Sequence, residues 1–400
     1  MEIRVAYIIT PTFGSTWSGT THRIFSLISG WHEDKITLDL LGTELKVLNS
    51  NSGEREYKLS GPIWNSPHHK MTFFERLKWT LQILWLFVSQ GRNYDIFHFM
   101  TIGWGALLSP VFLHPFGKKT VFSMTRYGYN NPSYLASSFR GKNAVRFLRR
   151  FDGITVLAQA FLEDCQKHGF KTKILVLPNF LTILKLECGR NIKDEEILRS
   201  ELVIPFNAQV LLFVGSDHKR KGLDIVVDAF IQLADKYPEI WLFIIGPGSK
   251  SDHTSVDVSF LEIQKLKLKE AGLHEHVVWT GMIKDLDRLA RYYSAADIMI
   301  FPTRGEGLGN VIIEAMYAGL PIVVSNLPGI TDTIITHGKN GYLVEVDDTQ
   351  GFVDSIDTLI KDPDLREKMG KYNQQKAEVL FSFETYCRKL KDFYLEIINT

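Results

Sequence analysis

The sequence predicts an α/β protein made of two successive domains, each built on a doubly wound parallel sheet. The chain has 400 residues, which is enough for about two domains. Hydrophobic residues make up 45% and charged residues 23%, a globular composition that excludes disordered and collagen-like chains. Short apolar runs alternate with helical patterns through both halves, and this alternation favours parallel sheets covered by helices.

The first half supplies one set of these elements. Its apolar runs predict strands at residues 3–9, 36–41, 96–99, 120–124, 154–157 and 174–177. Helices are predicted at residues 71–88 and 159–168. The longer helix carries an apolar stripe at helical spacing. The stripe consists of Phe73, Leu77, Leu81, Leu84 and Val88.

The second half repeats the alternation. Its predicted strands are residues 210–214, 241–245, 277–280, 298–301 and 321–325. Its predicted helices are residues 224–236, 260–271, 285–294 and 310–318. Residues 181–194 form the expected linker. We therefore expect one Rossmann-like domain over residues 1–180 and a second over residues 181–380.

Basic residues are concentrated near the beginning of the chain. The net charge is only +1, yet residues 1–150 hold 18 lysines and arginines against 9 aspartates and glutamates. One predicted helical face carries four of these cations: Lys142, Arg146, Arg149 and Arg150. Together with the aromatic residues of the helix at 71–88, they favour contact with an anionic membrane surface or an anionic lipid-linked acceptor. A merely solvated charged face is the alternative.

Three features bear on the compartment. No apolar run approaches the ~20 residues needed to cross a bilayer. The first residues lack the pattern of a secretory signal. The three cysteines form no C-x-x-C pair, which favours a reducing compartment and argues against a thiolate metal site. We therefore expect a cytoplasmic protein, with any peripheral contact at the inner face of the membrane.

A basic loop follows the predicted strand at residues 210–214. The segment reads Phe213-Val-Gly-Ser-Asp-His-Lys-Arg-Lys-Gly-Leu-Asp224. In open α/β sheets, ligands bind where strands end and helices begin. Arg220 and Lys221 therefore lie where a diphosphate would meet both charge and backbone N–H groups. A solvated basic turn is the alternative interpretation.

A glycine-rich loop follows the predicted strand at residues 298–301. It reads Thr303-Arg-Gly-Glu-Gly-Leu-Gly-Asn-Val-Ile-Ile-Glu314, and its glycines permit a ligand to approach the backbone closely. Glu306 in the loop and Glu314 eight residues later are strong acceptors for sugar and ribose hydroxyls. Acidic pairs are common on solvated helices, so the specificity of this motif comes from its glycines.

Three weaker candidates lie at other strand ends. Gly246-Pro-Gly248 and Thr280-Gly281 are positioned to border a base or a ribose, with ordinary turn chemistry as the alternative. His98 ends the predicted strand at residues 96–99. It is either a substrate ligand or a core histidine.

These segments together resemble the retaining GT-B glycosyltransferases of glycosyltransferase family 4. The resemblance runs from about residue 149 to the end of the chain. Besides the two loops, it is carried by Phe151-Asp-Gly-Ile-Thr-Val156, Lys173-Ile-Leu-Val-Leu-Pro-Asn179, Val278-Trp-Thr-Gly281, Tyr293-Ser-Ala-Ala-Asp297, Pro328-Gly329, Asn340-Gly-Tyr-Leu-Val344 and Phe381-Ser-Phe383.

The resemblance implies a GT-B fold, with two Rossmann-like domains facing a cleft. It also implies a C-terminal helix, within residues 381–400, that packs back on the first domain. The second domain would bind a nucleotide diphosphate sugar, a UDP- or GDP-sugar, and the first a glycan or lipid-linked acceptor. The implied activity is retaining hexosyl transfer in polysaccharide or glycolipid biosynthesis.

Carried over position by position, the resemblance assigns roles to particular residues, most of them in the two loops. Glu306 would contact the transferred sugar, and Arg220 and Lys221 would bind the diphosphate. Glu314 would bind the ribose. The other donor-binding positions would be Gly215, Ser216, Gly246, Gly281, Gly307, Leu308, Gly309, Asn310 and Val311. Neither a metal nor a cofactor is expected, because two cations already offset the charge of the diphosphate.

The sequence departs from the family pattern at two places. Ser216 stands where many members have arginine. Thr125-Arg126 follow the predicted strand at residues 120–124, where the family often has histidine. Two alternatives therefore stay open: a nucleotide-sugar-binding protein without catalysis, and a GT-B enzyme of another class, such as an epimerase or a phosphorylase. Nucleic-acid binding is not expected, because the donor-site motifs point to a different ligand.

Overall fold

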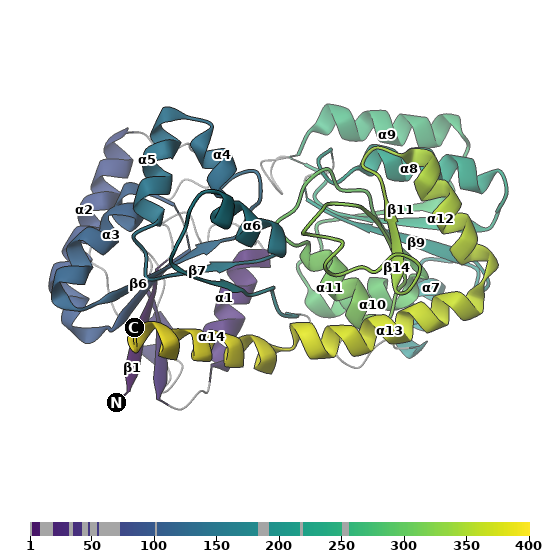
Figure 1. Cartoon of the computed structure of the whole chain (residues 1–400). Helices are drawn as coiled ribbons and strands as arrows, with labels where there is room; N and C mark the ends of the chain where they lie inside the picture. Colours follow the sequence, from purple (N-terminus) through teal and green to yellow (C-terminus); the bar gives the residue numbers. More distant parts are fainter. Residues whose placement is uncertain are drawn as a thin grey trace. The chain divides into compact units, whose positions relative to one another are not determined.

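The computed structural model describes residues 2–8, 19–31, 35–41, 47–48, 54–55, 73–100, 102–182, 192–216, 219–249 and 256–400 (Figure 1). Contacts divide the chain into two compact units. Unit 1 comprises Met1–Thr182 and Phe383–Thr400, and unit 2 comprises Ile183–Ser382. Most of the predicted linker lies outside the described residues.

Unit 1 is built on a six-stranded parallel sheet with the strand order β2-β1-β5-β6-β7-β8. Its strands are β1 (Ile3–Ile8), β2 (Ile36–Leu41), β5 (Ile96–Phe99), β6 (Lys119–Met124), β7 (Gly153–Val156) and β8 (Lys173–Val176). A short antiparallel pair, β3 (Val47–Leu48) and β4 (Glu54–Arg55), lies outside this sheet. The strands of the main sheet read as apolar runs because helices cover both of its faces. All six predicted strands of the first half are confirmed.

Two layers of helices cover this sheet. One layer contains α1 (Gly19–Gly30) and the C-terminal helix α14 (Phe383–Ile398), whose buried residues share one apolar core with β1, β2 and β5. The other contains α2 (Phe73–Gln90), α3 (Trp104–Leu113) and α5 (Phe139–Leu148), which lie side by side (Figure 1). It is completed by η1 (Gly91–Asn93), η2 (His114–Phe116), α4 (Pro132–Ala136) and α6 (Gln159–Lys167). The strand order reverses after β2, and right-handed crossovers therefore place α2 on the opposite face from α1.

The predicted stripe of α2 does not pack against the sheet. Its residues Leu77, Leu81 and Val88 are exposed. The buried residues are instead Ile83, Leu86 and Phe87, whose ring meets two phenylalanines of β5 edge-on. Both faces of α2 are apolar, so periodicity reveals a stripe without revealing which stripe faces the sheet.

Unit 2 is built on a second six-stranded parallel sheet, with the order β11-β10-β9-β12-β13-β14. Its strands are β9 (Gln209–Val214), β10 (Ile240–Ile245), β11 (Val277–Gly281), β12 (Ile298–Phe301), β13 (Ile322–Ser325) and β14 (Gly341–Val344). Its helices are α7 (Ile192–Glu201), α8 (Leu223–Ala234), α9 (Val258–Glu270), α10 (Leu286–Ala295), α11 (Asn310–Tyr317), α12 (Thr349–Lys361) and α13 (Pro363–Phe381), with η4 (His274–His276) before β11. The five predicted strands of the second half are confirmed.

The strand order of unit 2 reverses between β9 and β12. The chain runs outward from β9 through β10 to β11 and then returns to the other side of β9 with β12. The helices that follow β9 and β12 therefore lie on opposite faces of the sheet, and the two loops meet at the carboxyl ends of these strands. Ligands of open α/β sheets bind at such a point, and both charged motifs of the sequence lie in these two loops.

Candidate functional site

The loops after β9 and β12 are held against each other by their backbones. The N–H of Arg304 donates to the carbonyl oxygen of Arg220 over 2.8 Å. Gly222 has a φ of 78°, and a Cβ there would lie 2.0 Å from the carbonyl oxygen of Pro302. Only glycine satisfies both requirements at residue 222. The Lys-Gly-Leu sequence thus lets the basic loop meet the glycine-rich loop.

The three residues expected to be catalytic lie together between these loops. Glu306 is ion-paired with Lys221, and its Oε1 also lies 3.3 Å from Nη1 of Arg220. The side chains of Glu306 and Lys221 are only 9% and 12% exposed. Arg220 also donates to the carbonyl oxygen of Gly305. The loops thus bring two cations, the residue types that bind phosphate groups, next to a carboxylate that can accept hydrogen bonds from hydroxyls.

Arg304 of the glycine-rich loop is hydrogen-bonded to the basic loop and to the start of α8. Its guanidinium donates to both carboxylate oxygens of Asp224 over 3.0 and 2.8 Å and to Asp347 over 2.7 Å. It also donates to the carbonyl oxygen of Lys219, in the basic loop. This bidentate pair fixes the position of the glycine-rich loop relative to the start of α8. Sequence reasoning missed this role, because the pairing joins residues 80 positions apart.

Glu314 lies in the first turns of α11 and is held by a buried tyrosine. The hydroxyl of Tyr293 donates to its Oε2 over 2.5 Å. Burial raises the pKa of Glu314, while the Tyr293 hydrogen bond and the charge of Lys221 lower it. Burial and the neighbouring Glu314 both raise the pKa of Tyr293, so its phenol stays a donor. Glu314 is therefore a positioned acceptor, electrostatically coupled to the cationic cluster.

The Tyr293–Asp297 motif has two separate roles in this structure. Tyr293 positions Glu314, whereas Asp297 accepts hydrogen bonds from the buried guanidinium of Arg199 over 3.0 Å and from the N–H of Val210 over 2.9 Å. Asp297 thus anchors α7 to the start of β9. The sequence identifies this motif but does not show that Tyr293 and Asp297 have different partners.

The start of α11 directly follows the glycine-rich loop. Gly309 precedes it with a φ of 86°, and no side chain caps the first turn within the described residues. Gly307 and Leu308 precede this turn, and Asn310 and Val311 begin it. Backbone N–H groups at such a helix start attract anions.

The remaining predicted donor positions lie at neighbouring strand ends. Gly215 and Ser216 directly follow β9, and a Cβ on Gly215 would approach the stem of Lys221 to 3.0 Å. Gly246 follows β10, and its N–H donates to the carbonyl oxygen of Gly281 over 3.2 Å. All the predicted site residues therefore lie along the carboxyl edge of one sheet, in unit 2.

His98 of unit 1 is a core residue. Its ring nitrogens lie 2.6 Å from the Tyr394 hydroxyl and 2.7 Å from the Ser123 hydroxyl. Burial lowers the pKa of His98 to about 3, so the imidazole is neutral. It joins α14 to β5 and β6, and the substrate-ligand interpretation of His98 is wrong.

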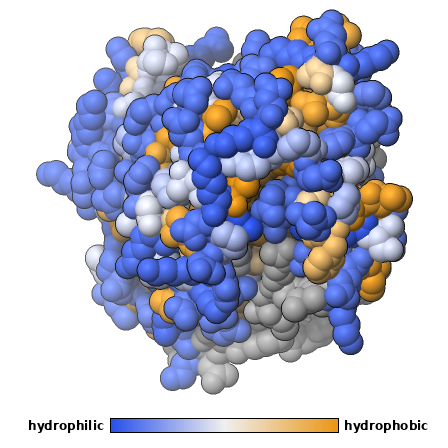
Figure 2. Space-filling view, turned by 90° about the vertical axis from the view of Figure 1, so that its right-hand side faces the viewer, coloured by the Kyte–Doolittle hydropathy of each residue, from blue (hydrophilic) through white to orange (hydrophobic). Residues whose placement is uncertain are grey.

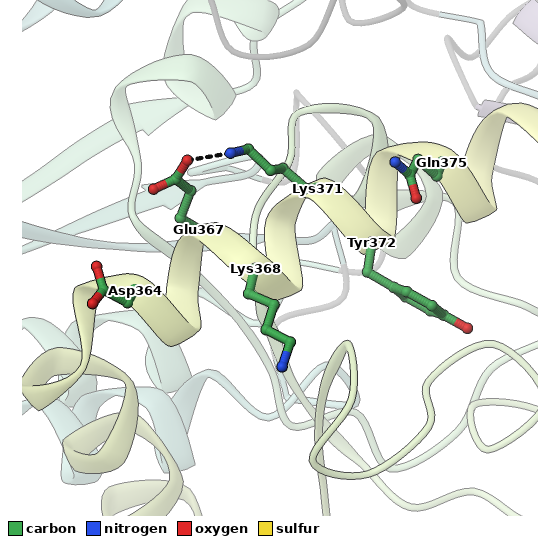
Figure 3. A pocket seen from close by; sticks show the side chains of 6 residues that line it. All are labelled: Asp364, Glu367, Lys368, Lys371, Tyr372 and Gln375. Carbon is green, nitrogen blue, oxygen red and sulfur yellow. Dashed lines mark hydrogen bonds and ion pairs between the residues drawn. The ribbon is translucent and has the colours of Figure 1, made fainter.

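A separate hollow lies on the surface of α13 (Figure 3). Its lining residues are Asp364, Glu367, Lys368, Lys371, Tyr372 and Gln375. All six come from one helix, and Lys371 is paired with Glu367. A hollow with a single wall gives a ligand little enclosure, so we do not assign it as a site. In the described part of the chain, no three His, Cys, Asp or Glu side chains are grouped as metal ligands.

Comparison with known families agrees with this geometry. Residues 194–376 match the family model described as glycosyl transferases group 1. The chain thus contains a glycosyl transferases group 1 domain, and this domain includes both loops.

Spore coat protein SA of Bacillus subtilis is 29% identical over 208 residues, 52% of this chain and 53% of that protein. The capsular polysaccharide biosynthesis glycosyltransferase CapM of Staphylococcus aureus is 28% identical over 240 residues, 58% of this chain and 60% of that protein. The chain therefore spans about half to three fifths of the length of these relatives.

Solved structures match the entire fold. Sucrose-phosphate synthase from Thermosynechococcus elongatus superposes with a TM-score of 0.76 at 19% identity, covering 100% of both chains. Anabaena HepE in complex with UDP and glucose superposes with a TM-score of 0.73 at 16% identity, covering 99% of this chain and 100% of that one. The predicted GT-B fold is confirmed: both six-stranded parallel sheets and the C-terminal helix are present.

Proposed function

We propose that the protein is a retaining hexosyltransferase. It transfers a sugar from a nucleotide diphosphate sugar, a UDP- or GDP-sugar, to a glycan or lipid-linked acceptor in polysaccharide or glycolipid biosynthesis. The observation that carries this proposal is the cluster of Arg220, Lys221 and Glu306 between the loops after β9 and β12. Unit 2 binds the donor and unit 1 the acceptor, in the cytoplasm at the inner face of the membrane.

The chemistry follows from the charges of the cluster. When the bond between the sugar and the diphosphate breaks, negative charge develops on the departing diphosphate. Arg220, Lys221 and the N–H groups at the start of α11 stabilise that charge, which lowers the barrier. Glu306 binds the transferred sugar and Glu314 the ribose hydroxyls. We expect no metal to be required, because the two cations offset part of that charge.

Three comparisons support the donor class. The family model covers the loops that contain the cluster. The CapM relative is named for glycosyl transfer in capsular polysaccharide biosynthesis. HepE, which shares the fold, was solved with UDP and glucose. We therefore expect a UDP-sugar to be the preferred donor.

Thermal unfolding with a panel of nucleotide sugars tests the proposal. UDP-, GDP- and ADP-glucose are each added at increasing concentration, and the midpoint temperature is recorded. A ligand at 100 times its Kd stabilises the folded state by about 2.7 kcal/mol, so the preferred donor raises the midpoint most. Incubation with acceptor extracts then shows whether sugar is transferred. No stabilisation by any nucleotide sugar contradicts the proposal.

A second candidate, a nucleotide-sugar-binding protein without catalysis, is favoured by one observation. Thr125 and Arg126 follow β6, where the resembling family often has histidine. Donor binding without transfer or hydrolysis across a broad acceptor panel would support this candidate. Formation of a free epimerised sugar, or dependence on phosphate, would instead indicate an epimerase or a phosphorylase.

Replacing Glu314 with alanine tests the donor site directly. We expect donor affinity to fall about 10- to 150-fold, because a lost charge-assisted hydrogen bond is worth ~1.5–3 kcal/mol. Calorimetric titration with the preferred nucleotide sugar measures the effect. Glu378→Ala, an exposed position on α13, is the matched control and leaves the affinity unchanged. Unchanged affinity in Glu314→Ala removes this carboxylate from the site.

A further inference from the structure

The outward face of α2 carries an unusual row of apolar side chains. Phe74, Leu77, Leu81, Trp85 and Val88, here called the apolar stripe, are 45% to 85% exposed. They recur every three or four residues and so occupy one side of the helix, along most of its 18 residues. At 1.5 Å per residue, the helix is about 27 Å long. Single exposed apolar residues are common on protein surfaces, whereas a contiguous exposed row indicates a surface that contacts a membrane, a ligand or another protein.

The neighbouring helix extends this surface. Trp104, Val111 and Phe112 of α3 and Phe116 of η2 are also exposed. Gly105 brings α3 close to Ile83 of α2, because a Cβ there would lie 3.1 Å from that side chain. α2 and α3 therefore present their exposed apolar residues from one layer of unit 1 (Figure 1). By contrast, the face shown in Figure 2 is mostly hydrophilic, and its apolar residues form small separate groups.

Cations accompany the apolar surface. Arg140, Lys142, Arg146 and Arg150, here called the basic group, are all exposed on α5 or just after it. α5 packs beside α3, and the ring of Phe147 meets that of Trp104 at a centroid distance of 6.1 Å. Within the described residues, none of the four lies in a salt bridge with a carboxylate. Residues 101–150 contain eight lysines and arginines and no aspartate or glutamate.

We propose that this surface binds an anionic lipid bilayer. The α2 helix lies in the plane of the interface with the apolar stripe toward the acyl chains, and the basic group contacts the headgroups. No helix in the described residues is long and apolar enough to cross a membrane, so the binding is peripheral. An exposed apolar row beside a group of cations complements a bilayer, because the acyl chains are apolar and the headgroups are anionic. This proposal goes beyond sugar transfer, and its test needs neither donor nor acceptor.

Co-sedimentation of the full chain with liposomes tests the proposal. Vesicles of phosphatidylcholine alone are compared with vesicles that also contain phosphatidylglycerol, at low and high salt. We expect binding to require the anionic lipid and to weaken as salt rises. The triple variant Arg140→Glu/Lys142→Glu/Arg146→Glu should bind at least about 100-fold more weakly, since each cation near the surface is worth about fivefold. The variant Lys269→Glu/Lys284→Glu/Lys368→Glu, exposed cations of unit 2, is the charge-matched control and should bind normally.

A second pair of variants isolates the apolar contribution. Leu81→Gln/Trp85→Gln adds no charge and should weaken binding about tenfold or more, with the salt dependence retained. Ile263→Gln/Leu266→Gln on α9, at 54% and 53% exposure, is the matched control and should bind as the original chain does. Circular dichroism and thermal unfolding confirm that each variant is folded.

Three results would overturn the proposal. The first is equal binding to neutral and anionic vesicles, or no binding to either. The second is a dimer in sedimentation velocity that the stripe variant dissociates without any vesicle binding, which would make this surface an interface between copies. The third is a stripe variant that unfolds early yet keeps full vesicle binding, which would mean that the stripe packs against protein.

Discussion

Replacing both Arg220 and Lys221 with alanine should lower turnover by at least about 10³-fold, because each preorganised donor at a developing oxyanion contributes about 10²–10³. Both cations contact Glu306, so they are already placed between the two loops. Steady-state kinetics with the preferred donor measure the loss. Near-normal turnover in the double variant would contradict the diphosphate role.

The same double variant needs a control for stability, because it leaves the mostly buried Glu306 without its two cations. Thr303 still donates to this carboxylate over 3.1 Å, but an unpaired buried charge destabilises the fold. Adding Glu306→Gln to the double variant removes that charge. The triple variant should therefore recover stability toward that of the original chain without recovering turnover. Recovery of turnover as well would mean that the cations act only through Glu306.

Gly222→Ala should destabilise the fold, with a loss of about 2–5 kcal/mol in the free energy of unfolding. A left-handed backbone costs a residue with a Cβ about 1–2 kcal/mol, and overpacking costs about 1–3 kcal/mol more. The overpacking arises at the carbonyl oxygen of Pro302, 2.0 Å from the new Cβ. Since Gly222 joins the two loops of the site, donor binding should fall together with stability.

Chemical denaturation of two control variants separates these contributions. Gly272 has a φ of 71°, and a Cβ added there would have nothing within 4 Å, so Gly272→Ala reports the backbone cost alone. Gly248 has open space and no positive φ, so Gly248→Ala should leave stability nearly unchanged. If Gly222→Ala lowers the free energy of unfolding no more than Gly272→Ala does, the close approach of residue 222 to Pro302 adds no overpacking cost.

The sequence reveals much of the fold because strand ends are local signals. Apolar runs bounded by Gly215 and Pro302 mark where β9 and β12 end, and the charged loops after them therefore fall at one sheet edge. Strand order is not local. That β9 and β12 are neighbours depends on pairing across more than 80 residues, and it is this pairing that brings Lys221 to Glu306.

Long-range side-chain partners are also invisible to pattern reasoning. The Arg304–Asp224 pair and the Tyr293–Glu314 hydrogen bond each join residues on different elements, and only the folded backbone selects them. The orientation of α2 escapes prediction for a related reason. Its apolar residues surround the helix, so the choice of buried face depends on the positions of Ile83 and Phe87 relative to α3 and β5.

The position of α14 has a consequence for synthesis on the ribosome. Unit 1 consists of two stretches of chain, with all of unit 2 inserted between them. Its core needs Leu390, Phe393 and Tyr394, and the Tyr394 hydroxyl is the partner of the buried His98. Unit 2 is contiguous, whereas the first 182 residues complete their core only after all of unit 2 has been translated. A nascent chain therefore carries the incomplete apolar core of unit 1 while unit 2 is being synthesised.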